Sequence, residues 1–356
     1  MRLATAVGTA SFHSLRTRAV TFALLLGCAL LAVSGPCYSQ ANPNAVAGMS
    51  PYATFHEGEI DAVGLAKGLL DLHAPLFHYP QRGGKLQFGY TIRYIPSSPY
   101  ETKTCPPKMA CYLSFGKSAG EVVVRADIGP LSADPGQNIQ YRQLGSIAMS
   151  DLTSHPLVPV GSLWRTADAT GMVYNPTTSV VTDRDGIQYT LGSSIKDPNG
   201  NTISLNASTG TWTDTLGRTF PPAQTTTETS GCTGPLPIIS ATVLDVPGPN
   251  GGTLPVTLCY AQISISETVD NKAVTAYANE VQSIVLPNGT AWTFTYGDGD
   301  LAQITLPTGG TIAYTWDKIL DCGQTQSVNP TFWISRVTSR TVNANDGTGP
   351  HEWTYL

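Results

Sequence analysis

A turn motif that recurs after 20 residues constrains the fold more than any other feature of this sequence. The motif is Leu-Pro-x-Gly, found at residues 286–289 and again at 306–309. Apolar and aromatic residues occupy alternate positions after each copy: they are Trp292, Phe294 and Tyr296, then Ile312, Tyr314 and Trp316. Alternation with a period of two is typical of a strand with one buried face. The fixed offset therefore predicts a repeat architecture in which each strand pair packs on the next copy.

A second repeated segment lies upstream, at an offset of 17 residues. Residues 197–203 read Asp-Pro-Asn-Gly-Asn-Thr-Ile, and residues 214–220 read Asp-Thr-Leu-Gly-Arg-Thr-Phe. Asp caps a turn through its side chain, and Gly adopts the positive φ that the turn requires. Both segments therefore predict a turn followed by a strand.

The composition agrees with a chain of strands and turns. The 356 residues include 35 Gly and 26 Pro, and only 13% are charged, whereas charged residues make up about 25% of an average globular protein. This mixture excludes coiled coils and helical bundles. The predicted fold class is all-β, with short antiparallel strands and hairpins. The net charge of -5 leaves nothing to neutralise a phosphate backbone, so nucleic acid is excluded as a partner.

The first 41 residues are predicted to be a secretory signal peptide. Arg16 and Arg18 precede an uncharged, mostly apolar run at 19–33, and small residues follow at 39–41. The run is shorter than the roughly 20 residues that span a membrane as a helix. We therefore expect an exported protein, secreted or held in the cell envelope, that does not span the membrane once the signal is removed. A lipoprotein site at Cys28 is the alternative, although Cys28 lies in the middle of the apolar run.

Five cysteines remain after removal of the signal peptide, and an oxidising compartment favours disulfides between them. Cys105 and Cys111 flank two prolines, whose rigid turn favours a bond between this pair. Cys232 pairs with Cys259 or with Cys322, and the sequence leaves that choice open. The spacings lack the close ligand pairs of a zinc site, so we expect neither a metal nor a cofactor.

The segment 292–310 resembles the YD repeats of RHS proteins. It combines aromatic residues spaced by one position, a Gly-Asp turn, a Leu-x-x-Ile strand and a Pro-x-Gly turn. Residues 60–65, 75–76 and 79–86 are similar to the region that precedes the repeats in large secreted members. The two Asp-x-x-Gly segments described above agree with the same family.

The resemblance covers roughly residues 55–95 and 180–356. It implies a wound β-sheet shell or spiral, exported to the cell surface or the medium, whose members act as carriers, adhesive surfaces or casings for toxic C-terminal domains. The chain stops at residues 353–356, inside a predicted strand and without the family's self-cleaving core motif or tip domain. We therefore expect a truncated reading frame or a short member of the family, and we do not assign the family's toxin or casing functions to this chain. We also expect the C-terminal edge to be aggregation-prone, because the last repeat has no neighbour to cover it.

The expected organisation has four parts. They are a signal peptide at 1–41, a linker at 42–54, an N-terminal β domain at 55–165 and a repeat region at 166–356. Only residues 62–72 have a helix-like pattern, and the family resemblance favours strands there.

Motifs that suggest catalysis or metal binding are better explained as turns. Residues 116–120 match Gly-x-Ser-x-Gly, but a β-branched run follows where a nucleophile elbow requires a helix, so Ser118 is interpreted as a turn residue. The acidic turns at 183–186 and 298–300 lack the distal Glu of a calcium loop. The histidines form no His-Glu-x-x-His pair. The chain is therefore predicted not to be an enzyme.

Trp292, Tyr296, Tyr314 and Trp316 are the candidate glycan-stacking residues. Exposed aromatic rings on a sheet stack against sugars, but a stripe repeated in neighbouring strands more often forms the inner face, because its exposure would leave a large apolar patch in water. The leading hypothesis is a non-enzymatic exported scaffold or cell-surface protein that assembles with downstream RHS repeats. The alternative is a carbohydrate-binding or adhesive module that recognises cell-envelope glycans.

Overall fold

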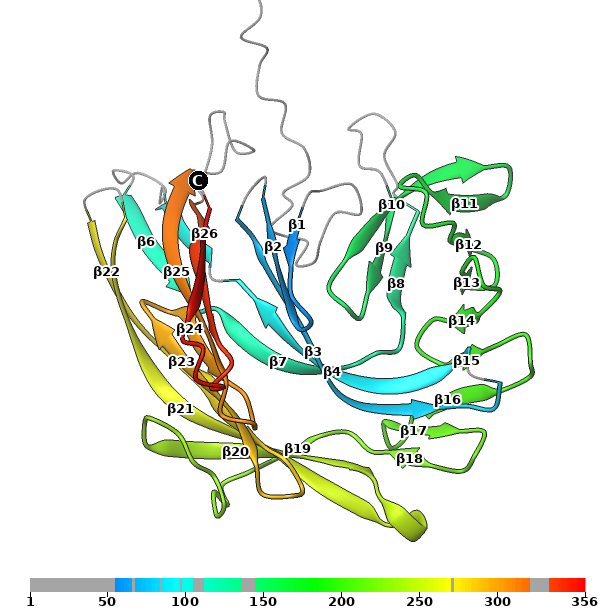
Figure 1. Ribbon diagram of the computed structural model, residues 1–356. Helices are drawn as coiled ribbons and strands as arrows, with labels where there is room; N and C mark the ends of the chain where they lie inside the picture. Colours follow the sequence, from blue (N-terminus) through cyan, green and yellow to red (C-terminus); the bar gives the residue numbers. More distant parts are fainter. Residues whose placement is uncertain are drawn as a thin grey trace, which may run out of the picture.

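The computed structural model describes residues 55–65, 68–83, 85–96, 98–104, 112–135, 145–269, 272–320 and 333–355. Within these residues the chain is almost entirely antiparallel β-structure, in three sheets and a separate hairpin (Figure 1). The predicted all-β fold class is therefore confirmed. The predicted signal peptide and linker, the candidate pair Cys105 and Cys111, and Cys322 lie outside the described residues.

The first sheet has five strands in the order β1-β2-β3-β4-β7. Its strands are β1 (Phe55–Glu57), β2 (Asp61–Gly64), β3 (Leu70–Pro80), β4 (Gln87–Ile95) and β7 (Glu121–Ala126). The separate hairpin pairs β5 (Ser98–Thr104) with β6 (Tyr112–Ser118). In the segment with the helix-like pattern, residues 62–64 belong to β2 and residues 70–72 to β3.

The second sheet has eleven strands, and each pairs only with its neighbours in the sequence, from β8 to β18. The strands are β8 (Pro130–Asp134), β9 (Gly145–Met149), β10 (Ser154–Val160), β11 (Leu163–Thr166), β12 (Val173–Asn175), β13 (Val180–Thr182), β14 (Gln188–Thr190), β15 (Ser194–Lys196), β16 (Thr202–Asn206), β17 (Thr211–Asp214) and β18 (Thr219–Phe220). Most are only three to five residues long, because turn residues interrupt the chain so often.

The third sheet has nine strands, again in chain order, from β19 to β27. They are β19 (Gln224–Thr226), β20 (Ile238–Pro247), β21 (Thr253–Val269), β22 (Lys272–Val285), β23 (Ala291–Gly297), β24 (Asp300–Thr305), β25 (Thr311–Leu320), β26 (Trp333–Asn343) and β27 (His351–Thr354). The expected strand near the C-terminus is present as β27, the last strand in this order.

The expected domain boundary after residue 165 falls within a continuous sheet. Residue 165 lies inside β11, and the eleven-stranded sheet continues across it without interruption. The main core also crosses this boundary, since the rings of Phe88 and Phe220 stack with centroids 3.9 Å apart. The pairing of neighbouring strands sets the extent of this sheet.

The recurring sequence motifs form recurring turns. In both Leu-Pro-x-Gly motifs the Gly N–H donates to the Leu carbonyl over 2.9 Å, at Gly289 and again at Gly309. Both glycines have positive φ, 81° and 90°, which costs a residue with a side chain more than it costs glycine. The two turns connect β22 to β23 and β24 to β25. The 20-residue repeat is therefore one hairpin turn used twice in the same sheet.

The upstream motif also forms recurring turns. At Asp197 and Asp214 the carboxylate accepts the backbone N–H four residues later, over 2.9 and 3.0 Å. Asp183 makes the same contact with the N–H of Ile187 over 2.9 Å. The structure thus adds a third copy at the acidic turn of residues 183–186.

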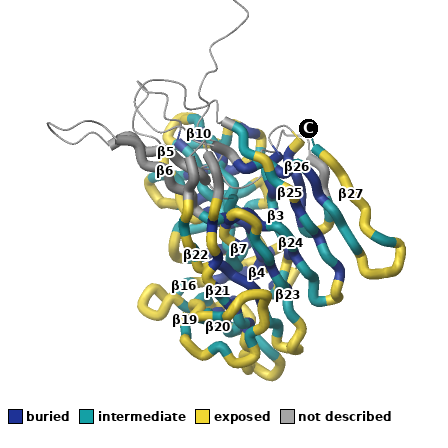
Figure 2. The backbone as a smooth tube through the Cα atoms, turned by 90° about the vertical axis from the view of Figure 1, so that its left-hand side faces the viewer, coloured by how far each residue is buried: buried dark blue, intermediate teal, exposed yellow. Residues whose placement is uncertain are grey.

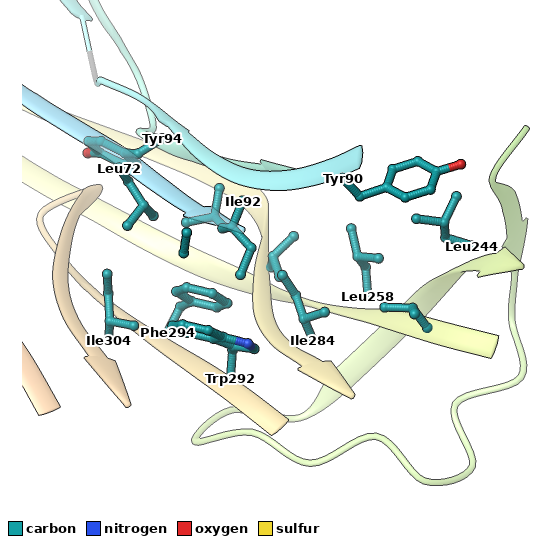
Figure 3. Close-up of a cluster of buried hydrophobic side chains, with 14 of the residues drawn as sticks. Leu72, Tyr90, Ile92, Tyr94, Leu244, Leu258, Ile284, Trp292, Phe294 and Ile304 are labelled. Carbon is teal, nitrogen blue, oxygen red and sulfur yellow. The ribbon is translucent and has the colours of Figure 1, made fainter. Parts of the chain in front are cut away.

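The main hydrophobic core lies between the five-stranded and nine-stranded sheets (Figure 3). Its members include Leu72 and Ile92 from the former and Ile284, Phe294 and Ile304 from the latter. Exposed positions gather in the turns, while the strands carry most of the buried ones (Figure 2). The same core takes in apolar side chains from the last strands of the eleven-stranded sheet, whose first strands enclose a smaller core of their own.

Candidate functional site

The candidate glycan-stacking aromatics lie in or against the main core. Trp292 and Tyr314 are buried, with 9% and 4% of their surface exposed, and Tyr296 and Trp316 are half-buried against the same cluster. The Tyr296 hydroxyl donates to the carbonyl of Val281 over 2.8 Å. These rings are therefore packed between sheets, as expected for the inner face of a repeat sheet.

The catalytic and acidic motifs adopt strands and turns. Ser118 ends β6, and β7 begins at Glu121, so a strand follows where a nucleophile elbow needs a helix. The Asp183 carboxylate accepts backbone N–H groups of its own turn, including that of Asp185 over 2.9 Å. Among the described residues, no three His, Cys, Asp or Glu side chains gather closely enough to hold a metal ion.

One disulfide resolves a choice that the sequence left open. Cys232 is bonded to Cys259, across a sequence separation of 27 residues. Cys259 lies on β21 and is fully buried, whereas Cys232 belongs to the exposed segment between β19 and β20. The bond therefore anchors an irregular Thr-rich and Pro-rich segment to the sheet.

A buried ion pair joins the five-stranded sheet to the nine-stranded sheet. The Arg340 guanidinium on β26 donates two hydrogen bonds to the Asp61 carboxylate on β2, both of 2.6 Å. Tyr314 on β25 donates a third, of 2.8 Å. Asp61 is fully buried and Arg340 is 6% exposed. Since charges are buried only when they are paired and hydrogen-bonded, this cluster fixes the relative position of the two sheets.

The electrostatics of this inter-sheet pair follow from burial and charge. Burial raises the pKa of Tyr314 well above its usual value, and the neighbouring Asp61 carboxylate raises it further. Burial lowers the pKa of Arg340, but the hydrogen bonds and charge of Asp61 outweigh it, so the net shift is upward. Sequence reasoning missed the pair because 279 residues separate its members.

The recurring Asp turns make a second junction between sheets. The Asp214 carboxylate accepts from Gln81 Nε2 over 2.8 Å and from Arg218 Nε over 2.7 Å. Arg218 also donates to the carbonyl of Pro80 over 2.9 Å, and Asn201 donates to that of Arg82 over 2.6 Å. The turns of the eleven-stranded sheet are thus docked on the β3–β4 connection of the five-stranded sheet.

A buried carboxyl group lies on β22, close to a second one. Glu280 is 6% exposed, and its Oε2 has no hydrogen-bond partner. Burial, with a smaller contribution from Glu121, raises the pKa of Glu280 to about 8. At neutral pH the protonated form of Glu280 therefore predominates, and a buried negative charge is avoided.

A hydrogen-bonded chain of Thr, His and Asp forms near β10. His155 contacts Asp168 Oδ2 through Nδ1 over 2.6 Å, and Thr153 Oγ1 through Nε2 over 2.9 Å. This order resembles that of a nucleophile, a base and an orienting acid. However, Thr153 Oγ1 also donates to Asp151 over 2.6 Å. The hydroxyl proton of Thr153 therefore has a carboxylate acceptor. These hydrogen bonds close the turn between β9 and β10 and join β10 to the β11–β12 connection, where Asp168 lies.

One hollow with aromatic walls lies between β8 and the strands β14, β15 and β17. Tyr189 and Trp212 line it, together with the hydroxyl-bearing residues Thr190 and Ser194. The remaining lining residues are apolar or glycine, so none of the described residues that line the hollow is charged. Both rings are half-buried. Sequence reasoning missed this site because the curl of the sheet brings β8 close to strands that are distant in its order (Figure 1).

Within the described part of the chain, no helix has the length and apolar character that crossing a membrane requires. Comparison of the sequence with protein-family models gives no match, and comparison with curated proteins gives none.

Proposed function

We propose that the chain is an exported, non-enzymatic scaffold of the RHS/YD-repeat type, forming a section of a wound β-sheet wall. The observation that carries this proposal is the strand order. From β8 to β18 and from β19 to β27, each strand pairs with its neighbours in the sequence. A chain built from neighbour contacts gains stability unit by unit, as repeat proteins do.

The recurring turns support the same proposal. The hairpin turns at Leu286 and Leu306 have the same hydrogen bonds, and the Asp turns recur three times in the eleven-stranded sheet. The Cys232–Cys259 disulfide fits an oxidising compartment, and so supports export. The sequence features of residues 1–41 point the same way.

The repeat architecture can be tested by removing one unit. Deleting residues 287–306 joins Leu286 to Pro307, which restores the Leu-Pro-x-Gly turn and removes β23 and β24. Because two strands are lost, β22 meets β25 in the antiparallel direction. We expect a folded β protein of lower stability, seen by circular dichroism and urea unfolding. A matched deletion of residues 287–301 does not restore the turn and should abolish cooperative unfolding. Equal stability and equally cooperative unfolding of the two deletion variants would contradict the proposal.

Export is tested separately by cell fractionation. The full chain should be recovered outside the cytoplasm with a new N-terminus near residue 42, and a variant without residues 1–41 should stay inside. Cytoplasmic recovery of the full chain with its original N-terminus would refute the export part alone.

Carbohydrate binding is the second candidate function, and the hollow beside Trp212 favours it. Two aromatic rings and two hydroxyl groups, with no charged lining residue, provide stacking surfaces and hydrogen bonds for a neutral sugar. Binding of oligosaccharides should change the tryptophan fluorescence, and Trp212→Ala should abolish that change. Trp164→Ala, on the same sheet but outside the hollow, serves as the control. An unchanged response of Trp212→Ala would remove this site from consideration.

A further inference from the structure

A half-buried lysine meets a buried aspartate in the nine-stranded sheet. Asp300 is the first residue of β24 and is 2% exposed, and the Lys318 side chain on β25 is 17% exposed. Lys318 Nζ donates a hydrogen bond to Asp300 Oδ2. An amine and a carboxyl group, the two halves of an amide, are therefore in contact inside the protein.

Ser335 connects the same two groups. It lies directly opposite Lys318 in the β25–β26 ladder and is 1% exposed. Its Oγ accepts a hydrogen bond from Lys318 Nζ and donates one to Asp300 Oδ2 over 3.3 Å. One hydroxyl group thus bridges the nitrogen and the carboxyl oxygen, which is the geometry of a proton relay.

The surroundings of this trio are buried and mostly aromatic. Leu301, next to Asp300, is fully buried, and its N–H donates to the hydroxyl of buried Tyr94 over 3.2 Å. The indole N–H of Trp316 donates to the Leu301 carbonyl over 2.7 Å, and the Tyr94 and Trp316 rings lie 5.9 Å apart. This packing holds the main chain beside Asp300 in place, so that amine and carboxyl meet in a fixed orientation.

We propose that Lys318 and Asp300 condense in the folded protein to an intramolecular amide, an isopeptide bond. One proton passes directly from the Lys318 ammonium to Asp300 Oδ2, and the neutral amine then attacks Asp300 Cγ. Ser335 Oγ takes a second proton from Nζ and delivers its own to Oδ2, so that the Cγ–Oδ2 bond breaks and Oδ2 leaves as water. Ammonium plus carboxylate gives amide plus one water, so atoms and charge balance without an oxidant or a cofactor. Groups held in contact react with effective concentrations of about 10⁵ to 10⁸ M.

The consequence is a covalent tie between β24 and β25. It joins residues 18 positions apart, within the segment where the Leu-Pro-x-Gly turn recurs. Such a bond would hold the two strands together even when the sheet is pulled or heated. This self-modifying activity goes beyond the scaffold role and does not depend on it, since the reaction requires only the folded nine-stranded sheet.

Mass spectrometry of the full chain, produced with its disulfide intact and shown to be folded by circular dichroism, tests the proposal. Trypsin cuts after an unmodified Lys318 and releases residues 273–318. We expect instead a fragment of residues 273–336, lighter by the mass of one water molecule, while cleavage at Lys272 and Arg336 in the same digest is the internal control. Release of residues 273–318 at full mass from the folded chain would show an ion pair only and would overturn the proposal.

Variants separate the chemistry from simple packing. Asp300→Asn should still form the bond but release ammonia in place of water, an outcome that no structural role predicts. Lys318→Arg keeps the charge and should show no mass loss. Ser335→Ala should slow bond formation at least several-fold after refolding. A wild-type mass loss that persists in Lys318→Arg would assign the bond to other residues and would also overturn the proposal.

Discussion

Neutralising Asp61 should destabilise the protein strongly, because this carboxylate is the partner of a buried guanidinium. In Asp61→Asn, Arg340 stays buried without its countercharge. The two hydrogen bonds of 2.6 Å from Arg340 are charge-assisted, and each bond of this kind contributes about 1.5 to 3 kcal/mol. Removing one partner of a buried ion pair costs about 3 to 5 kcal/mol. The two estimates agree, and we expect a loss of about 4 kcal/mol of unfolding free energy.

The same strand supplies the control. Arg336 on β26 donates to Asp317 over 3.0 Å, but this pair is exposed, with side-chain accessibilities of 33% and 54%. Solvent screens such a pair, so Asp317→Asn should cost less than about 1 kcal/mol. Urea unfolding followed by tryptophan fluorescence gives both free energies by linear extrapolation.

A double variant distinguishes the charge from the packing. Asp61→Leu combined with Arg340→Met replaces the buried pair by apolar side chains, and such replacements are often neutral or stabilising. We therefore expect the double variant to recover most of the stability that Asp61→Asn loses. If Asp61→Asn lowers the unfolding free energy by no more than Asp317→Asn does, the prediction is refuted, because the inter-sheet pair would then stabilise the protein no more than a surface contact.

Three other predictions follow from the described contacts. Because the pKa of Glu280 is raised to about 8 from its usual 4.5, the folded chain retains a proton that the unfolded chain has lost. Urea midpoints should therefore fall from about pH 5 to pH 8 and level off above, and Glu280→Gln should flatten this profile. Replacing Cys232 and Cys259 together by Ser opens a loop with a 27-residue separation and should cost about 3 to 4 kcal/mol, measured under non-reducing conditions; a cost below about 1 kcal/mol would count against the anchoring role. Asp214→Ala should lower the melting temperature more than Asp183→Ala does, because only Asp214 also bonds to the five-stranded sheet; equal losses would contradict this.

The strands and turns near the C-terminus could be predicted from the sequence because their causes are local. Alternation of Trp292, Phe294 and Tyr296 with small residues defines a strand within a few positions, and Gly289 defines its turn through a conformation that other residues rarely adopt. The sequence also predicts that the aromatic stripe forms the inner face of the sheet, because an exposed stripe would leave a large apolar patch in water.

The extent of the sheets could not be predicted in this way. The expected boundary at residue 165 separated a first β domain from the repeat-bearing region, whereas β11 continues the ladder of its neighbours across that position. Hydrogen bonding between neighbouring strands is indifferent to side-chain composition on the exposed face. The start of a repeat-bearing region in the sequence therefore says little about where one sheet ends.

Local patterns in this chain establish that it forms strands, where most of them turn and which faces they bury, because each depends on residues a few positions apart. The packing of one sheet against another decides the rest. Arg340 finds Asp61 across 279 residues, Cys232 pairs with Cys259, and Lys318 meets Asp300 and Ser335 inside the nine-stranded sheet. Such partners leave no periodic trace in the sequence, because their proximity arises only after the strands have paired and the sheets have curved together.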